Sequence, residues 1–162
     1  MVYELCMYVL SRSFQNPPIH TPNALIKSCL RTLQAYLSWI PLPYIFDTEL
    51  INALLTHFIV PISSRIEAIK CFTEIASLTF SEVDDPNVKN GYLEKLCYYY
   101  CLFIKSIADL TKDRDLTMEY ESVKDTKQRA GFENFARQTA LAISAVLKHN
   151  LTLIEQTTNT MD

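Results

Sequence analysis

The stretch WIPLPYIFDTELINALLTHFIVPISSRIEAIKCFTEIASLT, residues 39–79, contains most of the information about the fold. Its apolar residues recur three and four positions apart, which is the spacing of one face of an α-helix. Pro41, Pro43 and Pro61 interrupt this pattern, and proline ends helices because it has no N–H to donate and restricts the residue before it. The stretch therefore predicts one helix that ends near residue 39, a second that ends at Pro61, and a third that runs to about Leu78.

The second of these helices has a start that can be read from the sequence. Asp47 is a residue type that caps the amino terminus of a helix, and Phe46 is placed to pack against Ile51. Trp39, at the end of the first helix, carries a large ring that we expect to pack into the core between repeats. Pro41 fixes the turn, so the second helix is expected to run back antiparallel to the first.

Helical spacing continues on both sides of this stretch and predicts five amphipathic stripes. They are Ile26, Cys29, Leu30, Leu33, Leu37 and Ile40; Leu50, Leu54, Leu55 and Phe58; Ile62, Ile66, Ile69, Phe72 and Ala76; Leu93, Leu96, Cys97, Tyr100, Ile104 and Ile107; and Phe132, Phe135, Ala136, Thr139, Ile143, Val146 and Leu147. The segment SEVDDPNVKNG, residues 81–91, is predicted to be a surface loop, and a charged tract at 111–129 precedes the fifth stripe. The fifth helix is expected to end at 148–150, with a trailing helix from 151.

We predict an all-α superhelix of the HEAT or armadillo type, with about two complete helix pairs and flanking helices. Its expected parts are a leading helix at 3–14, a repeat at 22–59, a repeat at 62–110 and a partial repeat at 126–157. The first helices of the two pairs start roughly 40 residues apart, which is the period of such repeats. The helix at 62–78 also carries apolar residues beside its main stripe, as a helix packed within and between repeats must. A four-helix bundle satisfies the same periodicity and remains the alternative fold.

The composition is that of a folded protein, with 49% hydrophobic and 20% charged residues. Gly91 and Gly131 are the only glycines, which disfavours tight hairpins and phosphate-binding loops. A net charge of -3 argues against nucleic acid as a direct partner. The sequence shows no signal peptide and no apolar run near the ~20 residues of a membrane span. We therefore expect no membrane association and a place in the cytosol or nucleus.

Residues capable of catalysis or metal binding do not form a recognisable motif in this sequence. The five cysteines stand mostly among apolar residues, as reduced cysteines in a protein core do. Cys97 and Cys101 lie four apart and share a predicted helix face, but no further soft ligand stands nearby to complete a metal site. His20, His57 and His149 are each remote in sequence from a catalytic partner. We expect no enzymatic site, no metal and no cofactor.

The residues of the opening stretch resemble the exportin-1 family of nuclear export receptors. Trp39 to Leu42 forms a Trp-Ile-Pro-Leu turn, followed by Tyr-Ile-Phe and the acidic Asp47, and Lys70 to Ala76 reads Lys-Cys-Phe-Thr-Glu-Ile-Ala. The resemblance extends more faintly to CMYVLSRSFQNPP before this stretch and to FENFARQTALAISAVLKHNLTLIE after it. Pro43 departs from the family, which commonly has glycine there, and the charged tract at 111–129 does not align clearly.

This resemblance implies that the chain is a fragment of a much longer ring of HEAT repeats. Receptors of this family bind Ran-GTP together with a cargo protein that carries a leucine-rich export signal, and they move between nucleus and cytoplasm through the nuclear pore. The matching repeats lie between the Ran-embracing amino-terminal region and the central groove for export signals. The segment is thus expected to act as a structural scaffold, with Ran and nucleoporins as candidate contacts, and to bind no export signal itself.

The predicted helix at 89–110 contains the tyrosine run 98–100, and aromatic residues are enriched at protein interfaces. Tyr100 falls on the buried stripe, which leaves Tyr98 or Tyr99 as the exposed candidate. We predict that this helix lines the concave side and contacts a partner through Lys95, Tyr98 and Lys105; packing against the next repeat is the alternative. The residues expected to be structural are Trp39, Pro41, Phe46, Asp47 and Phe72.

Two other classes of function stay open at this point. One is a HEAT-repeat scaffold from another assembly, such as a phosphatase subunit or another relative of importin-β, against which the Trp39 turn and the Lys70 to Ala76 motif argue. The other is an α-helical enzyme, which no motif supports. Because repeats with open apolar ends need capping, the fragment is also expected to self-associate.

Overall fold

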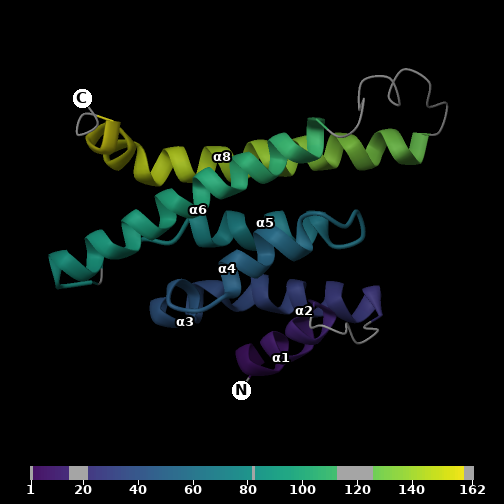
Figure 1. The fold of residues 1–162 in the computed structure, drawn as a ribbon, viewed down its shortest axis with the longest axis horizontal. Coiled ribbons are helices and arrows are strands. Elements are labelled where there is room, and N and C mark those ends of the chain that lie inside the picture. Colours follow the sequence, from purple (N-terminus) through teal and green to yellow (C-terminus); the bar gives the residue numbers. More distant parts are fainter. Residues whose placement is uncertain (1, 15–21, 82, 113–125, 159–162) are drawn as a thin grey trace.

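The computed structural model describes residues 2–14, 22–81, 83–112 and 126–158, and these residues form helices without any strand. In chain order the elements are α1 (Val2–Phe14), α2 (Asn23–Tyr36), the 3-10 helix η1 (Leu37–Trp39), α3 (Leu42–Phe46), α4 (Leu50–Ala53), the π-helix η2 (Leu54–Phe58), α5 (Arg65–Ala76), α6 (Pro86–Lys112) and α8 (Thr126–Thr158). Figure 1 shows α2, α5 and α8 side by side in series, with α1 at the opposite end from α8.

The helices form two layers. One layer consists of α2, α5 and α8, in which α5 contacts both of the others. The second contains α1, the run from α3 to η2, and α6: the ring of Phe14 on α1 stacks on His57 of η2 at 4.4 Å, and Ser106 Oγ on α6 donates to the carbonyl of Leu55 at 3.3 Å. An open series of paired helices is a solenoid and not a closed bundle, so the predicted fold class is confirmed.

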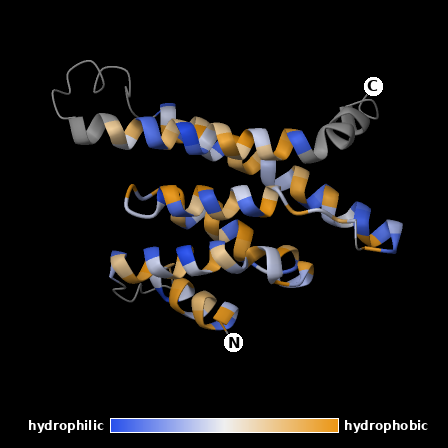
Figure 2. Cartoon of the chain, turned by 180° about the vertical axis from the view of Figure 1, so that it is seen from behind, coloured by the Kyte–Doolittle hydropathy of each residue, from blue (hydrophilic) through white to orange (hydrophobic). Residues whose placement is uncertain are grey.

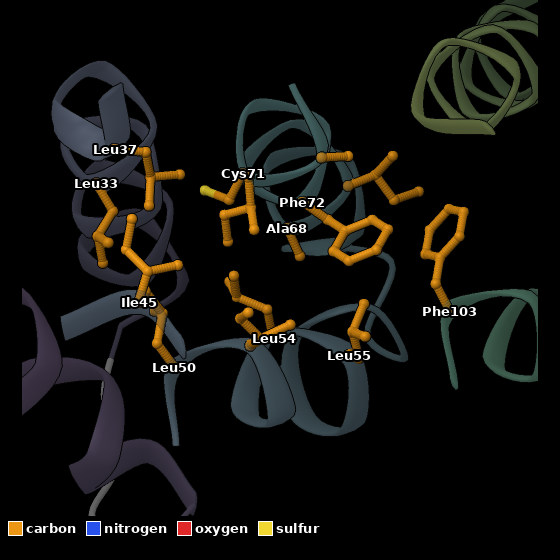
Figure 3. Close-up of a cluster of buried hydrophobic side chains, with 14 of the residues drawn as sticks. Leu33, Leu37, Ile45, Leu50, Leu54, Leu55, Ala68, Cys71, Phe72 and Phe103 are labelled. Atoms are coloured by element: carbon orange, nitrogen blue, oxygen red, sulfur yellow. The ribbon is translucent and has the colours of Figure 1, made fainter. Parts of the chain in front are cut away.

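The core lies between the two layers (Figure 3). Leu33 of α2 lies beside Ile45 of α3, and Leu54 of η2 lies opposite Cys71 and Ala68 of α5; all of these side chains are buried. On the other side of α5, the Phe72 ring stacks on Phe103 of α6 at 4.8 Å. Cys71 Sγ donates to the carbonyl of Leu30 at 3.2 Å, which joins α5 to α2. Each layer therefore supplies side chains that fill the gaps of the other.

Polar contacts join α2 to α5 along the edge of this core. Arg31 donates from Nε and Nη2 to Glu67 Oε1 at 3.2 and 2.9 Å, and Glu67 is only 7% exposed. One turn further along α2, Gln34 Nε2 donates to Glu74 Oε1 at 3.4 Å. A buried carboxylate needs such partners, because an unpaired charge away from water is strongly unfavourable.

The turn after α2 differs from the prediction at Asp47. The prolines start a short helix, α3, with Pro41 before it and Pro43 in its first turn, where the missing N–H costs nothing. Asp47 follows the end of α3 instead of capping the next helix. The helix α4 begins at Leu50, and Thr48 Oγ1 accepts a hydrogen bond from the Leu50 N–H at 3.3 Å. The Asp47 cap was thus predicted wrongly because proline was treated only as a helix terminator.

Trp39 is also placed differently from the prediction, since its side chain is 83% exposed. The residues of this turn that face the core are Leu37, which is buried, and Ile40, which is partly buried. Trp39 lies off the stripe that runs through Leu33 and Leu37, because each residue turns the helix by roughly 100°. Its ring therefore lies at the surface beside the α2–α3 turn.

The helix that ends before Pro61 changes from α to π geometry at Leu54. Its terminal carbonyls are satisfied from the next segment: Ser64 Oγ donates to Phe58 O at 2.8 Å, and Arg65 Nε donates to Ile59 O at 2.9 Å. With Ser64 and Arg65 engaged in these contacts, α5 begins at Arg65. Ile62, which was predicted to lie on the buried stripe, is therefore outside the helix and exposed.

The last two helices are longer than predicted. Asp85 Oδ1 accepts from the Asn87 N–H at 2.8 Å, so α6 begins at Pro86 and takes in the second half of the predicted loop. Its buried face centres on Phe103, and Ile104 is exposed. The helix α8 continues without a break from Thr126 to Thr158, where two helices were predicted, because no proline or glycine interrupts it near residue 150.

The stripe of α8 that faces α5 is rotated from the predicted one. Ala136 and Leu147 are exposed, whereas Gln138 and Ala142 are buried. The predicted face gave too much weight to apolar side chains at 136 and 147.

Truncation of Phe72 is expected to destabilise the chain far more than truncation of Trp39. Phe72→Ala removes a fully buried ring, and such changes cost roughly 3–5 kcal/mol, whereas an exposed site is usually within ~0.5 kcal/mol. Urea unfolding followed by circular dichroism measures both variants. Equal losses would show that the Trp39 ring is packed.

The thiols are expected to react in the order of their exposure. Cys101 is exposed, whereas Cys6, Cys29 and Cys71 are buried, and burial raises the pKa of Cys6 to about 11 and that of Cys71 to about 12. Because the thiolate is the reactive form, a disulfide reagent at pH 8 should modify Cys101 first and the buried three only on unfolding. Loss of the fast phase in Cys101→Ser, measured by absorbance, checks the assignment.

Candidate partner-binding surface

The three residues predicted to contact a partner all lie on α6. This helix buries Tyr92, Leu93, Leu96 and Phe103, and its other side carries Lys95, Tyr98 and Lys105. Tyr98 and Lys105 are seven residues apart, so they lie on the same side of the helix two turns apart. Lys95 lies on a neighbouring strip, and the three residues share one outward-facing part of α6.

Lys95 is engaged within the chain. Its Nζ forms an ion pair with the carboxylate of Asp47, and it lies 6.0 Å from the centre of the Tyr92 ring. The hydrogen bond to Asp47 raises the pKa of Lys95, so the ammonium group is retained throughout the physiological range. Both side chains remain almost half exposed. Lys95 thus ties α6 to the end of α3 and still presents charge to solvent.

An aromatic cluster lies beneath this ion pair. The Phe46 ring is 5.4 Å from Tyr92 and 5.6 Å from Phe80, and all three are buried. This places Phe46, predicted to be structural, in contact with the segment after α5 and with α6. Pairs of rings at these distances are favourable beyond their burial, so the position of α6 against α3 is well defined.

Tyr98 is the exposed member of the tyrosine run, at 65% exposure. Its ring meets the Tyr99 ring edge-on at 5.3 Å, and Tyr99 is partly buried, which raises its pKa. Tyr100 is also partly buried. A tyrosine held against a fixed neighbour presents contact area with little loss of side-chain freedom on binding. Lys105 is exposed and forms no ion pair with a described residue.

A second surface feature was not predicted from the sequence. A pocket of ≈ 260 Å³ lies between α1, the η1 end of α2, and α3. Its lining consists of Val2, Tyr3, Glu4, Cys6, Leu33, Tyr36, Trp39, Ile40, Pro41 and Tyr44. The sequence feature that could have indicated this pocket is the group of aromatic residues at 36, 39 and 44, which lie off the buried stripe.

Within the described part of the chain there is neither a metal-binding cluster nor a membrane-spanning helix. Among those residues, no three His, Cys, Asp or Glu side chains gather as they would around a metal ion. No described helix has the length and hydrophobicity needed to cross a bilayer. His57 stacks on Phe14, while His20 and the His149 side chain lie outside the described residues.

Comparison with known proteins gives consistent results. The family model for exportin 1-like protein matches residues 1–72. Protein EXPORTIN 1A of Arabidopsis thaliana is 32% identical over 157 residues, which is 97% of this chain, and exportin-1 of Schizosaccharomyces pombe is 31% identical over 159 residues, or 98%. The chain belongs to the exportin-1 family. It spans 13% of the length of each of these two relatives.

A further exportin-1, from Drosophila melanogaster, is 38% identical over 84 residues, which is 52% of this chain and 7% of the relative. The family resemblance predicted from the Trp39 turn and the Lys70 to Ala76 motif is therefore confirmed. This exportin-1-like chain corresponds to a small part of the length of these relatives.

Removal of the ion pair is expected to have a small effect on folding. Lys95→Met should lower the free energy of unfolding by no more than about 1 kcal/mol, because exposed pairs are screened by water and salt. Lys105→Met, on the same helix, should leave it unchanged. Chemical unfolding of both variants at low and high salt measures the difference, and a loss of several kcal/mol for Lys95→Met would contradict it.

Proposed function

We propose that this chain is a HEAT-repeat portion of a nuclear export receptor. In this proposal the intact receptor carries proteins with leucine-rich signals out of the nucleus together with Ran-GTP and moves between nucleus and cytoplasm. The observation that carries the proposal is the similarity to exportins over 97–98% of the chain, on a fold of stacked helix pairs. The segment itself acts as a scaffold and catalyses no reaction.

The repeats are divided as follows in this proposal. α1 is the second helix of a preceding repeat and corresponds to the leading helix predicted at 3–14. α2 with the run from α3 to η2 forms one repeat, at 22–59, and α5 with α6 forms the next, at 62–110. α8 begins a third, at 126–157. The two layers support this division, since α2 and α5 are each followed in sequence by a partner in the other layer.

The outward residues of α6 are the proposed contact with a partner of the receptor. Tyr98 offers an exposed ring on a fixed support, and Lys95 and Lys105 add positive charge on the same side of the helix. Aromatic residues are enriched at protein interfaces, and the polar rim of an interface accommodates charged side chains. Ran-GTP is the proposed partner, with nucleoporins as the second candidate.

A chimaeric receptor tests the scaffold function. Residues 1–162 replace the matching segment of the S. pombe exportin-1, and the nuclear export of a reporter with a leucine-rich signal is measured in cells that lack the parent receptor. Export is expected to be restored, because the lateral contacts of the stack are retained. A folded chimaera that forms no Ran-GTP-dependent cargo complex would refute the proposal, as would direct binding of a leucine-rich signal peptide to the isolated chain.

A photo-reactive amino acid at position 98 of the same chimaera tests the surface of α6. Crosslinking to Ran is expected at this position in the presence of GTP and cargo. The matched control is position 28, because Ser28 is also exposed on a helix but lies on α2, in the other layer. Crosslinking at 28 and not at 98 would place the partner on the opposite layer.

A further inference from the structure

The helix before Pro61 ends in an irregular turn. From Leu54 to Phe58 it has π geometry, in which the backbone hydrogen bonds span five residues instead of four. Such turns are rare, and many of them lie at functional sites. Figure 2, which shows the chain from behind, colours most of α4 and η2 as hydrophobic, as expected for a segment that lies between other helices.

The π geometry leaves one backbone acceptor without its usual donor. The Ile59 N–H donates to the Leu54 carbonyl at 3.0 Å, five residues back. In an α-helix the same N–H donates to the carbonyl four residues back, which here belongs to Leu55. Leu55 is only 1% exposed, and a buried carbonyl without a partner costs about as much free energy as a lost hydrogen bond. The Leu55 carbonyl therefore needs a donor from another part of the chain.

The helix α6 supplies this donor. Ser106 Oγ lies 3.3 Å from the Leu55 carbonyl and 2.9 Å from the carbonyl of Leu102 in its own helix. A serine hydroxyl has a single proton, so Ser106 shares it between the two carbonyls. The acceptor that the π turn frees is thus filled from a helix 51 positions further along the chain.

Another part of the π turn contacts α1. The Phe14 ring stacks on His57 with a centroid distance of 4.4 Å and an interplanar angle of 2°. The same ring meets Phe58 edge-on at 6.0 Å. Two successive residues of η2 therefore reach one ring of α1. Through these contacts and the Ser106 hydroxyl, the π turn is joined to both α1 and α6.

We propose that the π turn is a conformational device that the Ser106 hydroxyl of α6 holds in place. With this hydroxyl present, the Leu55 carbonyl accepts from α6 and the Ile59 N–H stays with Leu54. Without it, the Ile59 N–H moves to the Leu55 carbonyl and the last turn tightens towards α geometry. The docking of α6 thereby selects the backbone hydrogen bonds of the helix that it packs against.

Backbone NMR of the 162-residue chain tests this proposal. The scalar coupling across a hydrogen bond identifies the carbonyl carbon that is paired with a given amide nitrogen. In the parent chain, the Ile59 amide is expected to couple to the carbonyl carbon of Leu54. In Ser106→Ala, the ratio of the Leu55 coupling to the Leu54 coupling should rise about two- to tenfold, the shift that the net loss of one hydrogen bond supplies.

Three further variants separate the hydroxyl from general loosening of the fold. Ser106→Thr keeps the hydroxyl and should keep the parent ratio. Ser106→Cys has a weaker donor and should shift the ratio in the same direction by less. Ser77→Ala is the matched control, because Ser77 Oγ also donates to a carbonyl four residues back, that of Thr73 at 2.8 Å, within α5. It should leave the Ile59 couplings unchanged, and unfolding curves confirm that each variant is folded.

The His57 ring gives a second readout, because the stacked Phe14 ring shifts the resonances of its protons. In Ser106→Ala these resonances should move towards unstacked values, whereas in Ser77→Ala they should stay in place.

Three outcomes would overturn the proposal. The first is an unchanged ratio of couplings in Ser106→Ala. The second is a parent chain in which the Ile59 amide couples to Leu55 or to neither carbonyl, because the π turn would then not hold this amide. The third is an equal effect of Ser77→Ala, which would assign the change to general loosening.

Discussion

The burial of α5 between α2 and α8 is the contact on which the rest of the fold depends. Seven of its twelve residues are buried, which is more than a single amphipathic stripe provides. Cys71 and Glu67 meet α2, Phe72 meets α6, and Arg65 lies 5.4 Å from the Phe135 ring of α8. A helix of this length is only marginally stable alone in water, so its neighbours on each side provide its stability.

Much of the fold can be predicted from the spacing of apolar residues. The predictions that were wrong concern backbone geometry and hydrogen bonds, which this spacing does not encode. The apolar residues beside the main stripe of α5 correctly indicated packing on more than one side, because a helix with neighbours on several sides buries residues outside a single stripe. Asp47 was misplaced because the prolines start α3, which depends on the backbone of the whole turn. The π geometry of η2 has no signature in apolar spacing either, since its carbonyls are satisfied by Ser64 and Arg65 from the following segment.

The surface residues were less predictable than the core. Exposure of Tyr98 follows from its place on the helix, but the ion pair of Lys95 with Asp47 joins residues 48 positions apart and needs the folded stack. The same holds for the pocket, which brings together Tyr3 and Tyr44 from helices that only the tertiary fold places side by side. Trp39 shows the difference most clearly: helix periodicity puts Leu37 inside, as predicted, and Trp39 outside, although the size of its ring had suggested a place in the core.

Two contacts in the first turn of α5 join this helix to both of its neighbours. Glu67 pairs with Arg31 of α2, and Arg65, two residues earlier, lies over Phe135 of α8. The first turn of α5 is therefore held by both neighbours at once, through groups on the same rigid segment of backbone. The placement of α2 on α5 and that of α8 on α5 therefore share one short piece of helix. The apolar core between the layers and these polar contacts at its edge together fix how α5 sits between its two neighbours.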